Sequence, residues 1–172
     1  MSYFKPDKYY KTILDINYQK LKEEGITCLL FDLDNTLGLI SQKKCPDLTK
    51  QLIRTLKKDF TIFIISNNNK RRLLPYMGEL QIDGIPWSLK PSTRAFKKIE
   101  KKYNIPKNNM CIIGDQIVTD IFAGKRYKVK TILVDPLGKK DLKITSLNRL
   151  IEKLILKRYK KKRVFERGLY YE

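Results

Sequence analysis

Short apolar runs that alternate with amphipathic stretches are the feature that most constrains how this chain of 172 residues folds. The runs are continuously apolar, which is typical of parallel strands that are covered on both faces. Five of them occur, at residues 26–31, 61–65, 84–87, 110–113 and 131–134. The pattern predicts an α/β fold with a five-stranded, mostly parallel sheet and helices on both faces.

Helix signals lie between the apolar runs. Asp47 predicts a helix over 48–57 and Ser92 one over 93–103, because both are N-cap residues that follow a proline. A last long helix begins near Ser146, and its apolar residues have the spacing of one helical stripe, which we expect to pack on the sheet and not to enter lipid. The stripe consists of Leu147, Leu150, Ile151, Leu154 and Ile155.

We expect one domain over residues 1–172, because no repeat, linker or change of composition divides the chain. Residues 1–25 are expected to be an N-terminal helical extension, and residues 146–172 a basic amphipathic C-terminal helix and tail. The longest stretch without a charge is 60–69, which is shorter than the roughly 20 residues that cross a bilayer. Since the N-terminus also lacks the apolar core of a signal peptide, we expect a cytoplasmic protein.

Histidine is absent from the chain. Its absence excludes Ser/His/Asp and Cys/His nucleophile systems, phosphohistidine relays, and zinc or iron sites with His ligands. Acid and base catalysis near neutral pH must then come from carboxylates, Lys, Tyr or Cys.

Polar residues follow the first four runs at the point where each strand should end. The carboxyl ends of parallel strands meet at one edge of the sheet, and ligands bind beyond that edge. Carboxylates brought together there repel each other, and a hard divalent cation with oxygen ligands, usually Mg²⁺, resolves the repulsion. An Asp beside Mg²⁺ and a lysine suits attack on a phosphoryl group. The polar residues at these predicted strand ends are Asp32, Asp34, Thr36, Ser66, Asn67, Lys90, Asp115 and Asp120.

Residues 26–135 resemble the haloacid-dehalogenase-like (HAD) phosphatases, a superfamily with a Rossmann-like fold. All four motifs of that superfamily occur in order: DLDNT at 32–36, Ser66, Lys90, and Gly114-Asp115 with Asp120. Alone, the first motif is more often a solvated turn than a metal site, Ser66 is an ordinary helix cap, Lys90 an ordinary surface lysine, and Gly114-Asp115 can be a turn. Their joint occurrence at strand ends carries the resemblance.

The resemblance implies an aspartyl-phosphate mechanism. Asp32 is the implied nucleophile, and Asp34 protonates the leaving group and then activates water. Mg²⁺ is held by the Asp32 carboxylate, the backbone carbonyl of Asp34, and Asp115. Asp34 also indicates hydrolysis, because dehalogenases lack this acid and transport ATPases carry Thr in its place.

The resemblance assigns supporting roles to the other motif residues. Ser66 and Lys90 hold the phosphoryl oxygens. Asn67 lends its amide to the phosphate, although helix capping explains it equally well. Asp120 forms a hydrogen bond with Lys90 or with a metal-bound water, and a purely structural role is the alternative. Thr36 supports the residues that contact the metal and the phosphate.

The motifs leave no room for an inserted cap domain, because 29 residues separate the first motif from Ser66 and 23 separate Ser66 from Lys90. An open site favours a phosphate on something large, such as a protein, a nucleic acid or a lipid surface. The resemblance narrows to the capless YqeG-like family of subfamily IIIA through segments 6–10, 13–16, 31–37, 114–116 with 119–120, and 168–172. That family is similar to mitochondrial phosphatidylglycerophosphate phosphatases, which makes phosphatidylglycerophosphate the favoured substrate.

Positive charge is concentrated in the C-terminal half. The chain carries a net charge of +19, and residues 91–172 hold +14 of it. An anionic membrane surface is the favoured partner, at about 1 kcal/mol for each nearby cation, and this would place the protein at the inner face of the membrane. A phosphate backbone is the second candidate, and a merely solvated face remains open. The alternative functions are a basic RNA- or ribosome-associated module with a vestigial site, and a phosphatase of soluble or protein phosphoesters.

Overall fold

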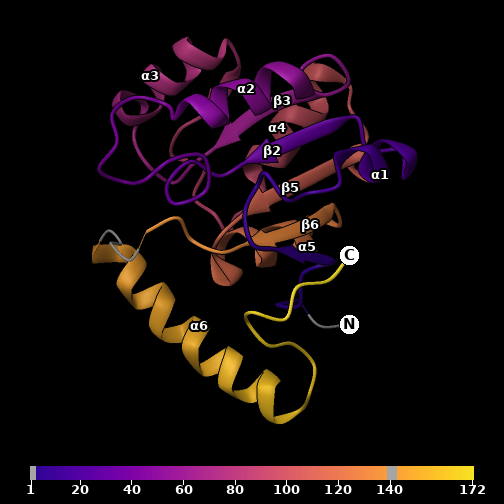
Figure 1. Ribbon diagram of the computed structural model, residues 1–172, viewed down its shortest axis with the longest axis vertical. Helices are drawn as coiled ribbons and strands as arrows, with labels where there is room; N and C mark the ends of the chain where they lie inside the picture. The colour runs from indigo at the N-terminus through magenta and orange to yellow at the C-terminus, as the bar shows by residue number, and fades with distance from the viewer. Residues whose placement is uncertain (1–2, 139–142) are drawn as a thin grey trace.

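A parallel sheet between two helical layers forms the centre of the protein (Figure 1). The computed structural model describes residues 3–138 and 143–172, and only the backbone of residues 143–147. Within these ranges, six parallel strands lie in the order β1-β6-β5-β2-β3-β4. They are β1 (Lys8–Tyr10), β2 (Cys28–Phe31), β3 (Thr61–Ile65), β4 (Asp83–Ile85), β5 (Met110–Gly114) and β6 (Lys130–Val134). The predicted α/β architecture is confirmed, with six strands instead of five.

The helices alternate with the strands along the chain. They are α1 (Tyr18–Glu23), α2 (Asp47–Leu56), α3 (Lys70–Leu80), α4 (Arg94–Tyr103), α5 (Phe122–Tyr127) and α6 (Lys143–Lys161), with a short 3-10 helix η1 (Lys107–Asn109) and a π-helical turn η2 (Ile117–Ile121). The predicted helices 48–57 and 93–103 are present as α2 and α4, and each starts one residue away from its predicted start. Among the described residues, no helix is long and apolar enough to cross a membrane.

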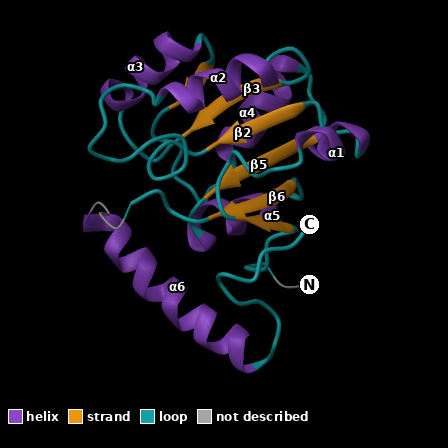
Figure 2. Ribbon diagram, viewed as in Figure 1, coloured by secondary structure: helices purple, strands orange, loops and turns teal. Residues whose placement is uncertain are grey.

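Alternate strand residues point to opposite faces of the sheet, so each face has its own core. On one face, Leu29 and Phe31 lie in a buried cluster with side chains of α1, α2 and α3. On the other face, Leu30 and Ile112 lie in a cluster with α4 and α5 (Figure 2). A third cluster around Tyr9 joins α6 to the end of the sheet formed by β6 and β1.

The N-terminal segment corrects one expectation. Residues 1–25 were expected to form a helical extension, and they contain α1 but also the edge strand β1, which pairs with β6. Tyr9 in β1 also exchanges two backbone hydrogen bonds with Tyr171, at 2.8 and 2.9 Å. The C-terminal ending therefore covers an edge that would otherwise expose unpaired backbone groups. A strand of three residues that begins with Lys8 has no periodicity by which the sequence could reveal it.

Helix α6 corrects a second expectation, because its apolar stripe does not pack on the sheet. Leu150, Ile151 and Leu154 are 57%, 39% and 64% exposed. Ile155 is half-buried, and the side chain of Leu147 lies outside the described residues. The face of α6 that packs on the domain instead contains the buried Glu152. Leu156 and Tyr159 of α6 pack against the third cluster. Helix α6 is therefore attached through Glu152, Leu156 and Tyr159, and not through the stripe that the sequence predicted.

Candidate active site

The strand register brings the motif residues to one edge of the sheet. Phe31, the last residue of β2, lies opposite Ile64 of β3 and Ile113 of β5. Asp32 follows Phe31, and its backbone N–H donates to the Ile113 carbonyl at 2.9 Å. Ser66 and Asp115 each lie two residues beyond these partners, so they reach the same edge as Asp32.

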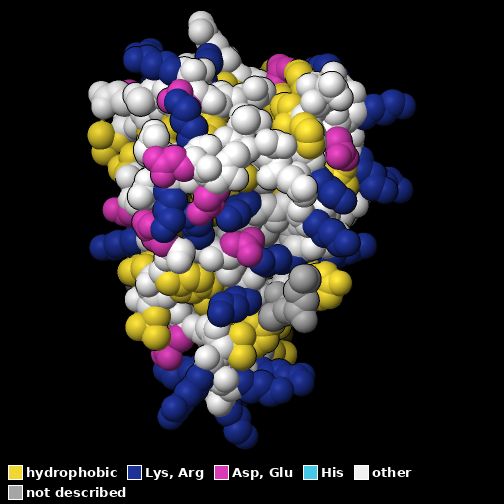
Figure 3. All heavy atoms as spheres, turned by 90° about the vertical axis from the view of Figure 1, so that its right-hand side faces the viewer, with side chains coloured by type: hydrophobic (Ala, Val, Ile, Leu, Met, Phe, Trp, Pro, Cys, Tyr) yellow, Lys and Arg dark blue, Asp and Glu magenta, His cyan; other side chains and the backbone are white. Residues whose placement is uncertain are grey.

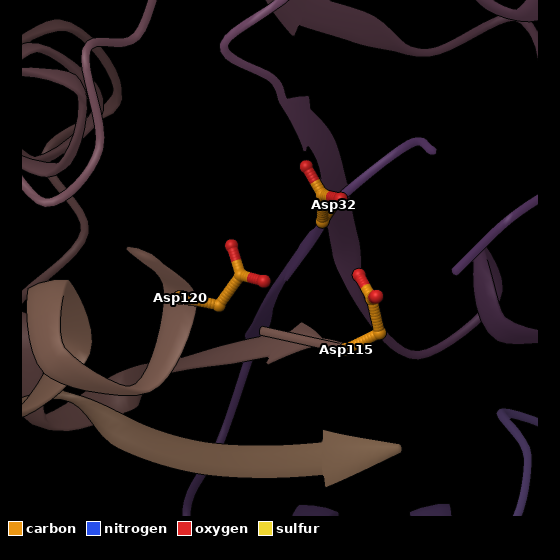
Figure 4. Close-up of side chains that lie close together, drawn as sticks. All are labelled: Asp32, Asp115 and Asp120. Atoms are coloured by element: carbon orange, nitrogen blue, oxygen red, sulfur yellow. The ribbon is translucent and has the colours of Figure 1, made fainter. Parts of the chain in front are cut away.

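Three carboxylates meet at this edge. Ligand oxygens of Asp32, Asp115 and Asp120 lie within 4.8 Å of one another, and all three residues are buried (Figure 4). Asp120 comes from η2, and its side chain lies over Gly114 at the end of β5. A Cβ at Gly114 would lie 2.3 Å from Asp120 Oδ2, closer than any side chain tolerates. The glycine of the fourth motif therefore makes room for the third carboxylate.

Lys90 links two of these carboxylates. Its Nζ donates to Asp32 Oδ1 at 2.5 Å, to Asp120 Oδ1 at 2.7 Å and to the Ile65 carbonyl at 2.8 Å. Burial opposes the charged form, but Asp120 and Asp32 outweigh it and raise the pKa of Lys90 above its ordinary value. Lys90 is thus a buried cation, and the structure contains the contact between Asp120 and Lys90.

The carboxylates show the electrostatic conditions of a cation site. Burial raises the pKa of Asp32 well above its usual range, and Asp120 and Asp115 add to the effect while Lys90 opposes it. Burial, with the repulsion of Asp120, also raises the pKa of Asp115 to about 7 against the opposing effect of Arg149. Clustered, buried oxygen donors with an excess of negative charge are the donor set that a hard divalent cation prefers. The residues present therefore fit such a metal.

Asp34 has a different environment from Asp32, although only one residue separates them. Its Oδ1 accepts from Arg72 Nε at 3.0 Å, and its Oδ2 accepts from Asn68 Nδ2 at 3.1 Å. Asn35 follows in the left-handed region with φ of 63°, which Asn tolerates better than most residues. The metal contact predicted for Asp34 involves its backbone carbonyl and stays a prediction.

The remaining motif residues support this edge in different ways. Ser66 is buried, and its Oγ accepts from the Asn68 N–H at 3.1 Å. Thr36 Oγ1 lies 3.4 Å from Asp115 Oδ1, to which it donates. The Asn67 amide holds the Lys90 backbone, with its Oδ1 accepting from the N–H at 2.7 Å and its Nδ2 donating to the carbonyl at 2.9 Å. The phosphate contact predicted for Asn67 stays a prediction.

Several residues that contact the site were not predicted from the sequence. Arg149 of α6 forms an ion pair with Asp115, and Arg167 Nη2 donates to the Asp115 carbonyl at 2.8 Å. Glu152 lies between the two arginines and bonds both of them. The only sequence signal was the i, i+3 spacing of Arg149 and Glu152 within a lysine-rich segment. Arg72 and Asn68, which hold Asp34, gave no signal of their own.

An open parallel α/β sheet with a buried lysine and an acidic cluster beyond the strand ends defines the class of HAD-like hydrolases. Residues 89–144 match the HAD-hydrolase-like family. The chain is 35% identical over 164 residues to the probable phosphatase YqeG of Bacillus subtilis (strain 168). The alignment covers 93% of this chain and 94% of that protein. The chain therefore belongs to the YqeG-like family of HAD phosphatases and is itself a phosphatase.

Two more distant similarities agree with this assignment. The chain is 26% identical over 170 residues to phosphatidylglycerophosphate phosphatase 1, chloroplastic/mitochondrial, of Arabidopsis thaliana, covering 91% of this chain and 48% of that protein. The cobalt-bound form of deoxy-D-mannose-octulosonate 8-phosphate phosphatase (YrbI) from Haemophilus influenzae aligns with a TM-score of 0.52 at 20% identity, covering 86% of this chain and 95% of that one. The second likeness shows the fold alone.

Proposed function

We propose that this phosphatase is a Mg²⁺-dependent phosphomonoesterase that works through an aspartyl phosphate on Asp32. The observation that carries the proposal is the position of the Lys90 ammonium between Asp32 and Asp120, beside the acidic cluster. A buried cation at this place can neutralise the charge of a phosphoryl group while Asp32 attacks it.

In the first step, a carboxylate oxygen of Asp32 bonds to phosphorus as the bond from phosphorus to the leaving oxygen breaks. Asp34, as a carboxylic acid, gives its proton to that oxygen, and the alcohol leaves. Lys90 and Ser66 hold the phosphoryl oxygens. In the second step, Asp34 takes a proton from water, whose oxygen attacks phosphorus, and the bond to Asp32 breaks to release inorganic phosphate.

The metal belongs to the same proposal. Asp32, Asp115 and the backbone carbonyl of Asp34 would hold Mg²⁺, with Asp120 beside them. When bound, Mg²⁺ supplies Lewis-acid stabilisation of negative charge on the phosphoryl group and on the clustered carboxylates. Thr36 would then fix the orientation of Asp115 through its hydroxyl.

For the substrate, we favour phosphatidylglycerophosphate at an anionic membrane surface. The similarity to the Arabidopsis phosphatidylglycerophosphate phosphatase supports this choice. So does the open edge, because residues 37–65 and 67–89 form only turns, α2, β3, α3 and β4 and include no inserted domain. Exposed apolar side chains lie in the segments that flank the site, with Trp87 and Leu89 just before Lys90. Leu137 lies beside Asn35, to whose carbonyl its N–H donates at 2.9 Å.

Helix α6 supports a peripheral position on the inner face of the membrane. Its exposed side combines apolar residues in the first half with lysines and arginines toward its end. Figure 3 shows Lys and Arg side chains gathered at the lower end of the molecule, where α6 ends. Apolar contact together with attraction to anionic lipids is how amphipathic helices bind a bilayer surface. The exposed residues are Leu150, Ile151, Lys153, Leu154, Lys157, Arg158, Lys160 and Lys161.

The test is phosphate release by the purified chain in Mg²⁺ from phosphatidylglycerophosphate in anionic vesicles, and from nucleotide, sugar and peptide phosphates. We expect the lipid to be the best substrate and an Asp32→Asn variant to be inactive. Activity no greater than that of the variant on every substrate would refute the mechanism. Activity on small phosphoesters but not on the lipid would refute the substrate.

A further inference from the structure

The side chain of Arg72 joins the second aspartate of the first motif to the turn that follows the motif. Its Nε and Nη2 lie 3.0 and 2.8 Å from Asp34 Oδ1. Its Nη1 donates to the Gln42 carbonyl at 2.7 Å, and its Nη2 to the Leu39 carbonyl at 3.0 Å. One guanidinium therefore fixes three points, which its planar array of donors allows and the single ammonium of a lysine does not.

Arg72 is itself held in place. It lies in the first turn of α3, where its backbone N–H donates to the N-cap Asn69 at 2.9 Å. Its guanidinium lies 4.9 Å from the centre of the Tyr76 ring, and Tyr76 is fully buried. The side chains of Arg72 and Asp34 are only 15% and 11% exposed. The Arg72–Asp34 ion pair is thus mostly buried and has further contacts that fix its geometry, whereas the side chains of an exposed surface salt bridge remain mobile.

The contacts leave Asp34 restrained at both oxygens. Asn68 donates to Oδ2 at 3.1 Å and Arg72 donates to Oδ1, and the carboxyl group keeps further lone-pair positions for a proton. Proton transfer requires the donor to be held within hydrogen-bond distance of the leaving oxygen, and a small misplacement has a large effect on rate. The restraint on Asp34 is therefore of the kind that an acid and base needs.

We propose that Arg72 is a positioning residue, which orients the Asp34 carboxyl toward the leaving oxygen and fixes the 39–42 turn beside it. The inference rests on the proposed function, in which Asp34 protonates the leaving group. A positioning role predicts that the effect of losing Arg72 depends on the leaving group, which a purely structural role does not predict. Loss of Arg72 should matter most when the leaving oxygen needs a proton.

The experiment compares two small phosphomonoesters, benzyl phosphate and dinitrophenyl phosphate. The benzyl alkoxide is a poor leaving group that needs protonation, and the dinitrophenolate leaves without it. We would measure kcat/KM for both with the wild type, Arg72→Gln and Arg72→Lys. Asp34→Asn gives the reference pattern. Arg71→Gln is the matched control, because it removes the same charge from the exposed neighbouring residue.

For Arg72→Gln we expect kcat/KM to fall by about 10- to 100-fold with benzyl phosphate and by less than about threefold with dinitrophenyl phosphate. Asp34→Asn should show the same selectivity with a larger loss, and Arg71→Gln should stay within about twofold on both substrates. Arg72→Lys should recover only part of the loss, because one ammonium cannot reach all three acceptors. In the Asp34→Asn background, Arg72→Gln should add little further loss with benzyl phosphate.

The ratio of the two substrates does not depend on the fraction of folded enzyme, so a destabilised variant cannot imitate the expected result. An equal loss on both substrates, or no loss on either, overturns the positioning role of Arg72 even if Asp34→Asn is selective. If Asp34→Asn itself lacks selectivity, the proposed acid is wrong and the inference is overturned with it. Wild-type activity no greater than that of Asp32→Asn rejects the proposed function as a whole.

Discussion

Helices α2 and α6 both look amphipathic in the sequence, yet only one of them uses its apolar side against the sheet. Ile53 of α2 is fully buried in the core, whereas Leu154 of α6 is 64% exposed. The sheet edge that carries the candidate site, with its strands and the α2 and α3 layer, is thus built on apolar packing. Helix α6 is attached through Glu152 and two arginines that reach Asp115, and through Leu156 and Tyr159, which lie outside its apolar stripe. An apolar stripe predicts that a helix contacts an apolar surface, but it does not predict whether that surface is the sheet of the same chain.

The contrast separates two kinds of residue that are expected to respond differently to substitution. Residues at the sheet edge should affect the chemistry or the fold. Exposed residues of the same type elsewhere should affect neither. Each of the first three predictions compares a buried position with an exposed control position, and the last compares one variant across pH.

The largest effect is expected for Asp32→Asn. An amide oxygen is a poor nucleophile, so we expect phosphate release to fall by at least about a thousandfold. Incubation with labelled substrate should then leave no covalent phosphate on the protein. Asp47→Asn at the exposed start of α2 is the control and should keep full activity. Near-normal turnover by Asp32→Asn would assign the nucleophile to another residue.

The next effect is expected for Gly114→Ala. The added Cβ would lie 2.3 Å from Asp120 Oδ2, so either the end of β5 or the carboxylate must move. We expect kcat to fall by about 10- to 100-fold, because a displacement of this size misaligns the Lys90 network. The control is Gly78→Ala in α3, where a Cβ meets nothing within 4 Å among the described residues. It should raise stability by up to about 1 kcal/mol without loss of activity.

A third pair tests the apolar contrast directly. Ile53→Ala leaves a cavity in a fully buried position and should lower the free energy of unfolding by about 2–5 kcal/mol. Leu154→Ala should lower it by less than about 0.5 kcal/mol, because the side chain is mostly exposed. Denaturant titration measures both values. A loss above about 2 kcal/mol for Leu154→Ala would show that α6 packs through its apolar stripe after all.

The smallest effect concerns the strand that the sequence did not reveal. Asp7 accepts hydrogen bonds from the Thr131 N–H at 2.9 Å and from its hydroxyl at 2.8 Å, next to the pairing of β1 with β6. Burial alone would raise the pKa of Asp7, but hydrogen bonds from Lys125 and Thr131 outweigh burial and lower the pKa below its ordinary value. A carboxyl with a lowered folded-state pKa stabilises the protein above its unfolded pKa and loses that contribution as the pH falls.

Asp7→Asn should therefore be less stable than the wild type at neutral pH. The difference should be less than about 1 kcal/mol, since the carboxylate is partly exposed and water screens it. It should shrink as the pH falls below about 4. Thermal unfolding of both proteins between neutral and acidic pH measures it. A difference that is independent of pH would mean that the carboxylate charge is not what stabilises β1.

Much of the candidate site could be predicted because its geometry depends on the ends of parallel strands. Asp32 and Ser66 directly follow apolar runs, Asp115 follows one after Gly114, and strand pairing places such positions at one edge. Arg72 and Arg149 could not be predicted in the same way, because they reach the site from helices. Which helical side chain reaches a strand end depends on how far each helix is shifted along the sheet.

The sequence by itself determined the α/β alternation, the absence of histidine chemistry and the set of aspartates with one lysine, because these follow from residue type and local order. The tertiary structure alone decided that Asp120 completes the acidic cluster over Gly114 and that Arg72 holds Asp34. It also decided that α6 keeps its apolar stripe exposed. Contacts between distant segments depend on packing and on buried ion pairs, whose free energy is set by neighbours that local sequence does not specify.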